Sequence, residues 1–288
     1  MARTRSHRTS RPDRGGGRKS SGGLLHPAYT AFARIYDRWC ADLDPPRWGR
    51  YNVALARRHG FTAGRVLDLG CGTGLSTRPW AGIADTVIGV DRSPTMLRLA
   101  RRLGGGAHRV RYLRADITAP GLLRGETFGV VLANFDVVNY QTRGQSLLRL
   151  FRNARRLLEP GGCFIFDAVT RHAYRRLLNG IPVFQRVPGG AVLLEGRYQE
   201  RSASWRGSVT ILLAGRDGRY RALVERHHQR HYTRARLRAL LRAAGFARCH
   251  FYATLTFRPP GPRTERVTVV ARHPRVSVSH RSNSLGSR

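Results

Sequence analysis

A glycine-rich loop that directly follows a short apolar run is the feature that most limits how this chain can fold. The run covers residues 65–69, and the loop Gly70-Cys71-Gly72-Thr73-Gly74 comes immediately after it. Glycines at alternating positions let a backbone turn tightly and approach a ligand where a Cβ atom would collide. A dinucleotide loop would have its third glycine at position 75, which is Leu75 here. The pattern therefore predicts a nucleoside ligand that need not carry a diphosphate.

Strand-like and helix-like segments alternate around this loop. The apolar runs that predict strands are residues 65–69, 86–91, 110–115, 128–133 and 163–166. Helical patterns are expected at residues 27–40, 47–59, 94–104 and 146–158, with a further helical stretch between the glycine loop and residue 86. Repeated strand-helix units predict an α/β fold with a Rossmann-like, doubly wound and mostly parallel sheet. Such a sheet binds its ligand at the carboxyl ends of the strands.

The pattern changes after residue 170. Residues 191–197, 203–214 and 220–232 alternate polar with apolar side chains, and residues 216–219 have the sequence of a hairpin turn. These features predict a small antiparallel β insertion. A helix from Thr233 to Gly245 and two further strands then return to the main sheet.

These patterns divide the chain into a core, an insertion and two tails. The core, with its N-terminal covering helix, is expected at residues 25–170 and 233–273, and the inserted antiparallel substrate layer at residues 171–232. Residues 1–24 form a basic arm and residues 274–288 a Ser- and Arg-rich tail. Both tails have too few apolar residues to pack, so we expect them to be disordered.

Two acids follow the next two predicted strands. Asp91 ends the second strand, 17 residues beyond Gly74, and Asp116 follows the third. An acid at the first of these places can accept hydrogen bonds from both hydroxyls of a ribose. The second is placed to accept from an adenine amino group. A glycine loop together with two acids at successive strand ends is a much more specific signal than the loop alone.

Residues 65–167 resemble the core of the class I S-adenosylmethionine-dependent methyltransferases. The matching segments are Val66-Leu67-Asp68-Leu69-Gly70-Cys71-Gly72-Thr73-Gly74, Val87-Ile88-Gly89-Val90-Asp91, Arg114-Ala115-Asp116-Ile117 and Leu158-Glu159-Pro160-Gly161-Gly162. The resemblance implies a methyltransferase whose cofactor is S-adenosyl-L-methionine. Looser matches at residues 32–37 and 135–140, and the β layer before the last helix, are similar to members that act on small molecules.

The resemblance also implies roles for residues around the glycine loop. Gly70, Gly72 and Gly74 would admit the methionine and ribose parts of the cofactor. Asp68 would act near the methionine amino group, directly or through water, and Asp91 would hold the ribose.

Four further residues are assigned to the cofactor by the same resemblance. Asp116 and the backbone of Ile117 would hold the adenine. Asn134, just past the fourth strand, would offer a backbone carbonyl to the methionine amine. Tyr36, in the first helix, would cover the cofactor.

The acceptor side of the site is less defined. Transfer from a sulfonium is an in-line substitution that needs no protein nucleophile and no metal, so no metal site is expected. An acceptor that must lose a proton needs a base. The candidates are Asp136 and Asn139, which follow the fourth strand, and His227, which shares a strand face with Glu225 if residues 225–232 are extended.

The charge of the chain leaves the acceptor open. Lys+Arg number 52 against 17 Asp+Glu, a net charge of +35, which favours an anionic partner such as nucleic acid. Lys19 is the only lysine and the arginines are spread along the chain, as codon bias would also produce. We expect a small-molecule acceptor methylated at N or O. An RNA or protein methyltransferase that uses the arginine-rich surface is the alternative, and a non-catalytic cofactor-binding module is a third hypothesis.

Cysteine spacing and hydropathy bear on the environment of the protein. The four cysteines stand far apart, with no Cys-x-x-Cys pair that would indicate zinc or a dithiol. No window reaches the ~18 consecutive apolar residues of a membrane helix, and the N-terminus lacks the apolar region of a secretory signal. We therefore expect a soluble, cytoplasmic protein with no membrane partner. The sequence gives no prediction of its oligomeric state.

Overall fold

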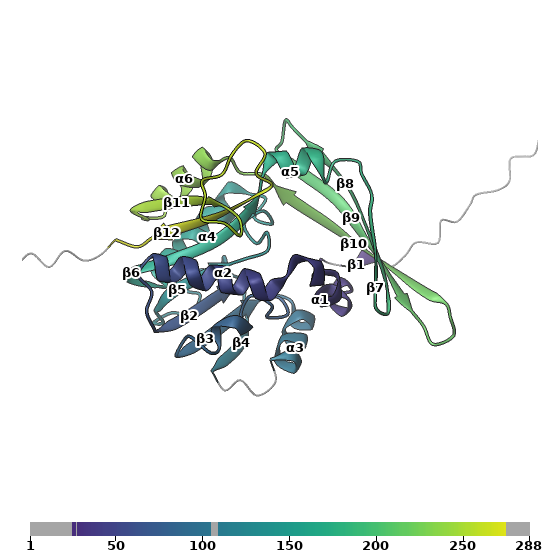
Figure 1. The fold of residues 1–288 in the computed structure, drawn as a ribbon, viewed down its shortest axis with the longest axis horizontal. Helices are drawn as coiled ribbons and strands as arrows, with labels where there is room; N and C mark the ends of the chain where they lie inside the picture. The colour runs from purple at the N-terminus through teal and green to yellow at the C-terminus, as the bar shows by residue number, and fades with distance from the viewer. Residues whose placement is uncertain (1–24, 27, 105–108, 275–288) are drawn as a thin grey trace, which may run out of the picture.

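The computed structural model describes residues 25–26, 28–104 and 109–274. The basic arm predicted over residues 1–24, and the predicted tail apart from Pro274, lie outside the described residues. The described chain forms one sheet of seven strands and one of five. Figure 1 shows the five-stranded sheet extending from one side of the larger sheet. In the part of the chain described, no helix has the length and apolar character needed to cross a membrane.

The seven-stranded sheet confirms the predicted Rossmann-like α/β fold. Its strand order is β11-β12-β6-β5-β2-β3-β4. Only β12 runs antiparallel to its neighbours; the other pairs are parallel. The strands are β2 (Arg65–Leu69), β3 (Thr86–Asp91), β4 (Val110–Arg114), β5 (Phe128–Ala133), β6 (Leu158–Val169), β11 (Arg248–Ala253) and β12 (Arg266–Arg272). β3 and β4 lie on one side of β2, whereas β5 and β6 lie on the other. Such sheets bind ligands where the strand order switches sides, which is here between β2 and β5.

Helices cover both faces of this sheet because its central strands are apolar on both sides. In β5, Val131 packs in the cluster that contains α4 and α6, and the adjacent Val130 packs in the cluster that contains α2. Figure 1 shows α2 crossing one face. The long helices are α2 (Pro45–Arg58), α3 (Pro94–Leu103), α4 (Gly144–Arg156) and α6 (Arg234–Ala243). The side chain of Ser93 accepts from the backbone N–H of Met96 and so caps α3.

The second sheet confirms the small antiparallel insertion. It follows α5 (Arg171–Arg176) and has the strand order β1-β10-β9-β8-β7. Its strands are β7 (Val183–Val187), β8 (Gly190–Gln199), β9 (Ser204–Ala214) and β10 (Tyr220–Arg230), joined by the parallel two-residue strand β1 (Leu25–His26). The sequence pattern did not predict α5 or β7. Since β1 belongs to this sheet, the N-terminal segment contacts the insertion as well as the core, and the domain boundaries stay a prediction.

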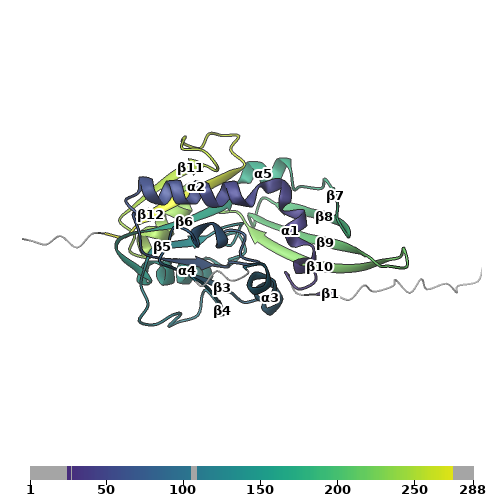
Figure 2. The same ribbon diagram turned by 60° about the horizontal axis from the view of Figure 1, so that its bottom comes forward.

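The continuous helix expected at residues 27–40 is wrong. The chain forms three short turns instead: η1 (Phe32–Arg34), α1 (Tyr36–Trp39) and η2 (Ala41–Leu43). Glu225 of β10 accepts hydrogen bonds from four successive backbone N–H groups at the start of η1, so its carboxylate fixes this segment. Phe32 and Ile35 then pack against the inner face of the insertion. In Figures 1 and 2, α1 lies between the core and the insertion strands.

Two other helix predictions near the core are corrected. After the glycine loop only the short turn η3 (Arg78–Trp80) forms, because Pro79 supplies no backbone donor and Asp68 holds the side chains of Ser76 and Thr77. The helix predicted to reach residue 158 ends at Arg156, and β6 begins at Leu158 rather than at residue 163.

Candidate active site

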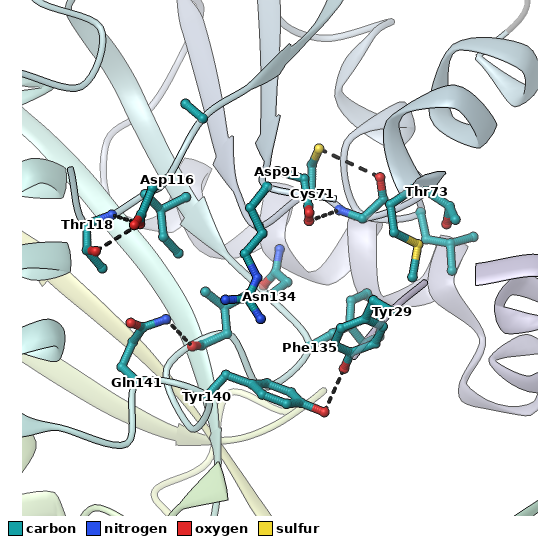
Figure 3. Close-up of a pocket in the computed structure, with 18 of the residues that line it drawn as sticks. Tyr29, Cys71, Thr73, Asp91, Asp116, Thr118, Asn134, Phe135, Tyr140 and Gln141 are labelled. Carbon is teal, nitrogen blue, oxygen red and sulfur yellow. Dashed lines mark hydrogen bonds between the residues drawn. The ribbon is translucent and has the colours of Figure 1, made fainter. Parts of the chain in front are cut away.

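A cavity of about 370 Å³ lies where β2, β3, β4 and β5 end. Figure 3 shows side chains from these strand ends and from the N-terminal segment converging on it. Seven of the residues predicted to bind the cofactor line it: Tyr36, Gly70, Gly72, Asp91, Asp116, Ile117 and Asn134. Asp68, Gly74 and the three predicted acceptor residues Asp136, Asn139 and His227 do not belong to its lining. The structure thus brings together most of the cofactor residues that the sequence predicts.

The three glycines of the loop differ in the space that surrounds them. All have positive φ angles, of +76°, +54° and +82° in chain order. A Cβ atom on Gly70 would lie 2.5 Å from Val137, whereas one on Gly72 would meet no described atom within 4 Å. A Cβ atom on Gly74 would lie 2.4 Å from the hydroxyl of Tyr112. Gly72 therefore keeps space open at the cavity. Gly74 packs against Tyr112 and does not line the cavity, so its contact with the cofactor stays a prediction.

Asp91 joins the loop to the helix that follows it. Its Oδ2 accepts from the backbone N–H of Gly72 at 3.0 Å, and its Oδ1 accepts from the N–H of Ser93 at 2.7 Å. Burial raises the pKa of this carboxyl group, while the two backbone hydrogen bonds act in the opposite direction. Each carboxylate oxygen has a second lone pair that remains able to accept from a bound hydroxyl.

Asp116 begins a tight turn at the end of β4. Its Oδ1 accepts from both the N–H and the hydroxyl of Thr118, each at 2.8 Å, as Figure 3 shows. The carbonyl of Ile117 accepts from Asn153 of α4 at 2.9 Å. These bonds fix the turn, and the exposed Asp116 side chain lines the cavity beside it.

The backbone after β5 turns in an unusual way. Phe135 and Asp136 have φ angles of +57° and +67°, the left-handed region that costs an L-residue roughly 1–2 kcal/mol. The preceding residue, Asn134, is buried, and its Oδ1 accepts from Asn52 at 3.1 Å. Its Nδ2 has no hydrogen-bond partner among the described residues. Adjacent strained residues and an unpaired buried donor are features found at ligand sites.

Asp68 is buried beneath the loop and does not face the cavity. Its Oδ2 accepts from the hydroxyls of Ser76 and Thr77, both at 2.7 Å, and burial raises its pKa. Its Oδ1 has no partner within the described part of the chain. The side chain thus shapes the loop, and a contact with the cofactor would have to go through a water molecule.

Asp136 takes part in a partly buried ionic network next to the cavity. Arg266 of β12 contacts both Asp136 and Asp167, and Gln229 donates to Asp136 at 3.1 Å. The ring of Trp48 lies 5.5 Å from the Arg266 guanidinium. Because its carboxylate is held by Arg266 and Gln229 and does not line the cavity, Asp136 is not placed to take a proton from an acceptor.

Asn139 connects the core to the insertion. Its side-chain amide donates to the carbonyl of Arg230 at 2.9 Å, and its Oδ1 accepts from the backbone N–H of Val169 at 2.9 Å. Its backbone carbonyl accepts from the N–H of Arg230 at 2.8 Å. The side chain is fully buried and committed to these backbone groups. We therefore withdraw the predicted acceptor contact of Asn139 in favour of a structural role.

His227 does not line the cavity, but it forms a hydrogen bond with a residue that does. Its Nδ1 is 2.7 Å from the hydroxyl of Tyr140, and its Nε2 is 3.3 Å from Oε2 of Glu225. Tyr140 lines the cavity together with Tyr29, whose hydroxyl donates to that of Tyr140 at 2.9 Å. Figure 3 shows these two side chains pointing toward each other. The sequence places residues 135–140 after a strand, but its pattern indicates no role for Tyr140 or for Tyr29.

Other lining residues had only weak sequence signals. Arg92 directly follows Asp91, while Ser146 and Arg149 lie three positions apart in α4, on one helical face. The structure also brings one apolar side chain of α3, Met96, to the cavity. In the described part of the chain, no group of three His, Cys, Asp or Glu side chains is placed to hold a metal ion.

Comparison with known sequences places a known domain over this site. A model of the methyltransferase domain family matches residues 66–162, from β2 to the middle of β6. A Bacillus subtilis protein provisionally named as a methyltransferase, YqeM, is 24% identical and covers 87% of this chain and 99% of its own length. The ubiquinone biosynthesis O-methyltransferase of Ruegeria pomeroyi is 32% identical and covers 48% of this chain and 55% of its own length.

Solved structures share the whole fold. An S-adenosylmethionine-dependent methyltransferase from Clostridium acetobutylicum aligns with a TM-score of 0.76 at 21% identity, covering 85% of this chain and 99% of its own. The sugar N-methyltransferase KedS8 from Streptoalloteichus aligns with a TM-score of 0.66 at 20% identity, covering 93% and 100% of the two chains. At these identities the likeness is one of fold.

Proposed function

Because the chain is a class I S-adenosylmethionine-dependent methyltransferase, we propose that it transfers the methyl group of S-adenosylmethionine to an N or O atom of a small-molecule acceptor. The proposal rests mainly on one observation: Gly72, Asp91 and Asp116, which follow three successive strands, line the same cavity. Its placement supports binding of a nucleoside cofactor at one end of the cavity and of the acceptor at the other.

The residues present fit the cofactor. Above Gly72 there is room for a ligand, since a Cβ atom there would meet no described atom within 4 Å. In the proposal Asp91 holds the ribose hydroxyls, and Asp116 with the backbone of Ile117 holds the adenine. Asn134 serves the methionine end, because its buried Nδ2 needs an acceptor that the described residues do not supply.

The N-terminal segment is proposed to close the site over the bound cofactor. The hydroxyl of Thr73 in the glycine loop donates to Asp37 of α1, and the hydroxyl of Ser93 donates to the carbonyl of Tyr29 at 3.0 Å. Tyr36 lines the cavity from the same segment. When bound, S-adenosylmethionine supplies an electrophilic methyl group on a sulfonium. The protein's part is to orient the acceptor and exclude water, which supports transfer without a protein nucleophile.

The size and the lining of the cavity support a small acceptor. Its wall is completed by Tyr29, Tyr36 and Tyr140, and its volume of about 370 Å³ suits a metabolite rather than a folded polymer. Relatives and structural neighbours whose names include a ubiquinone biosynthesis O-methyltransferase and a sugar N-methyltransferase support the same class. The choice between N and O belongs to the proposal and is left to experiment.

An assay with radiolabelled S-adenosylmethionine tests the proposal. The full chain is incubated with a low-molecular-weight cell extract and, separately, with purified RNA and with total protein, beside the variant Asp91→Ala. We expect label in the small-molecule fraction, lost in the variant. Label in RNA alone or in protein alone would overturn the small-molecule proposal in favour of the macromolecular alternative. An absence of label in every fraction, despite cofactor binding, would favour the non-catalytic hypothesis.

A further inference from the structure

Four side chains form an unbroken hydrogen-bonded chain that leads from the cavity into the protein. Tyr29 donates to Tyr140 at 2.9 Å, Tyr140 meets Nδ1 of His227 at 2.7 Å, and Nε2 of His227 lies 3.3 Å from Glu225. The two tyrosines line the cavity. The other two residues are almost completely buried, with 5% of His227 and 0% of Glu225 exposed. The chain therefore connects the cavity to an imidazole that is almost completely buried.

Glu225 is held in its ionised form. Its two oxygens accept from the backbone N–H groups of Tyr29, Thr30, Ala31 and Phe32 at 2.6–2.9 Å. Burial alone would raise the pKa of this carboxyl group, but the hydrogen bonds from His227 and from the backbone outweigh it, and the pKa is lowered. A carboxylate with this many donors accepts from every neighbour and donates to none.

The ionised carboxylate sets the direction of the whole chain. Nε2 of His227 must carry the proton that faces Glu225, so in the neutral ring Nδ1 is the unprotonated, basic nitrogen. Tyr140 then donates its hydroxyl proton to Nδ1, and Tyr29 donates to Tyr140. The oxygen lone pairs of the two tyrosines are left for a hydrogen of the acceptor. Every hydrogen bond in the chain is donated in the direction that leads from the cavity toward Glu225.

We propose that Tyr140 and His227, oriented by Glu225, form a proton relay that deprotonates the methyl acceptor. This inference rests on the proposed function and deepens it, because it requires an acceptor atom that carries a hydrogen: an amine or a hydroxyl group. Tyr29 orients that group by hydrogen bonding beside Tyr140. Tyr140 is the catalytic residue that touches the acceptor, and His227 acts through it.

The step balances in atoms and charge. The N–H or O–H bond of the acceptor breaks, and its electron pair forms the new bond to the methyl carbon, while the pair of the carbon–sulfur bond stays on sulfur. The acceptor proton passes to the hydroxyl oxygen of Tyr140, whose own proton passes to Nδ1 of His227. The resulting imidazolium is paired with the Glu225 carboxylate. After the product leaves, the proton returns to solvent by the same route.

The other nearby carboxylate does not compete for this task. Asp136 is bound by Arg266 and Gln229 and lies outside the lining of the cavity. Among the candidate bases named from the sequence, His227 alone is connected to the cavity through a hydroxyl group.

A tautomer measurement tests the relay independently of the acceptor. The full chain is labelled with ¹⁵N-histidine, and the signals of His227 are assigned by their loss in His227→Gln. At a pH where the ring is neutral, we expect a protonated Nε2 and an unprotonated Nδ1. A protonated Nδ1 would reverse the direction of the chain and overturn the relay, whatever the outcome of the activity assays.

Kinetics with matched variants test the proton transfer itself. In His227→Gln the new side chain can still accept from Tyr140 and donate to Glu225, but it cannot take up a proton. We expect this variant and Tyr140→Phe to lower methyl transfer to the active small-molecule fraction by about 10²–10⁴-fold, with unchanged affinity for S-adenosylhomocysteine. The exposed Tyr220→Phe is the control for a lost hydroxyl group.

The two proposals fail in different ways. Full activity in either His227→Gln or Tyr140→Phe overturns the relay and leaves the proposed function intact. If both variants lose binding of S-adenosylhomocysteine, Tyr140 and His227 have a structural role in the site, and this result also overturns the relay. A wild-type chain that binds the cofactor but methylates no small molecule contradicts the proposed function, and the relay with it.

Discussion

The carboxylate of Asp91 accepts a hydrogen bond from the backbone N–H of Gly72 at 3.0 Å, so the acid that ends β3 holds the glycine loop that follows β2. The same carboxylate accepts from the N–H of Ser93, at the start of α3. Two strand ends and one helix start are thereby fixed around one side of the cavity. The arrangement explains how a loop with little side-chain bulk keeps a defined shape.

Replacing Asp91 by Ala should weaken binding of S-adenosylhomocysteine by about 10-fold to 100-fold, since hydrogen bonds to a charged group contribute about 1.5–3 kcal/mol. Isothermal titration calorimetry of the full chain measures the change. Asp85→Ala removes an exposed acid of the same size six positions earlier and serves as the control. Equal affinities in the two variants would remove Asp91 from the cofactor site.

Substitutions of Gly72 and Gly74 should differ in their effects on cofactor affinity and on the stability of the protein. Gly72→Ala places a Cβ atom in open space at the cavity, so we expect a loss of stability of only roughly 1–2 kcal/mol from its positive φ but a large loss of S-adenosylhomocysteine affinity. Gly74→Ala meets the Tyr112 hydroxyl and should be the more destabilising change. Urea unfolding and calorimetry of both variants test this, and the reverse order of effects would contradict the assigned roles.

The parts of the site that the sequence predicts are those fixed by the order of strands and loops. Glycines at a strand-to-helix turn and acids at strand ends come to one edge of a parallel sheet whatever the packing around them. The structure accordingly places Gly72, Asp91 and Asp116 together. The packing of Gly74 could not be predicted because its neighbour Tyr112 comes from another strand, and a sequence pattern does not show which side chain will fill the space beside a glycine.

Asn139→Ala should destabilise the protein without changing cofactor affinity. The substitution leaves the N–H of Val169 and the carbonyl of Arg230 without their side-chain partner in a buried position. Each unsatisfied buried group costs about 1–3 kcal/mol. Urea unfolding measures the stability, and calorimetry with S-adenosylhomocysteine measures the binding. Unchanged stability with a lower methyl-transfer rate would restore the acceptor contact first expected from the sequence.

Glu225→Gln should remove a pH-dependent part of the stability. The pKa of Glu225 is below its ordinary value of 4.5, so the carboxylate contributes stability that is fully present above pH 4.5 and is lost as the pH falls through the lowered pKa. We expect the wild type to exceed the variant by about 1.5–3 kcal/mol above pH 4.5, and the difference to shrink on acidification. Urea unfolding over this pH range would contradict the account if the difference were constant.

The acceptor side could not be predicted because it is built from long-range contacts. Tyr29 and Tyr140 meet His227 across 198 and 87 positions of the chain, and no local pattern connects them. The N-terminal segment has helical spacing, yet the carboxylate of Glu225 draws its backbone N–H groups into a short turn. Asn139 and Asp136 lie near the strand end, as expected, but backbone groups and Arg266 already occupy their polar atoms.

A crystal structure of the full chain with S-adenosylhomocysteine tests the central claim most directly. The account predicts the ribose hydroxyls on Asp91, the adenine beside Asp116 and the sulfur directed toward the Tyr29–Tyr140 pair. A nucleoside bound in this cavity with its sulfur directed toward Arg149 and away from the tyrosines, or bound elsewhere on the protein, would contradict it.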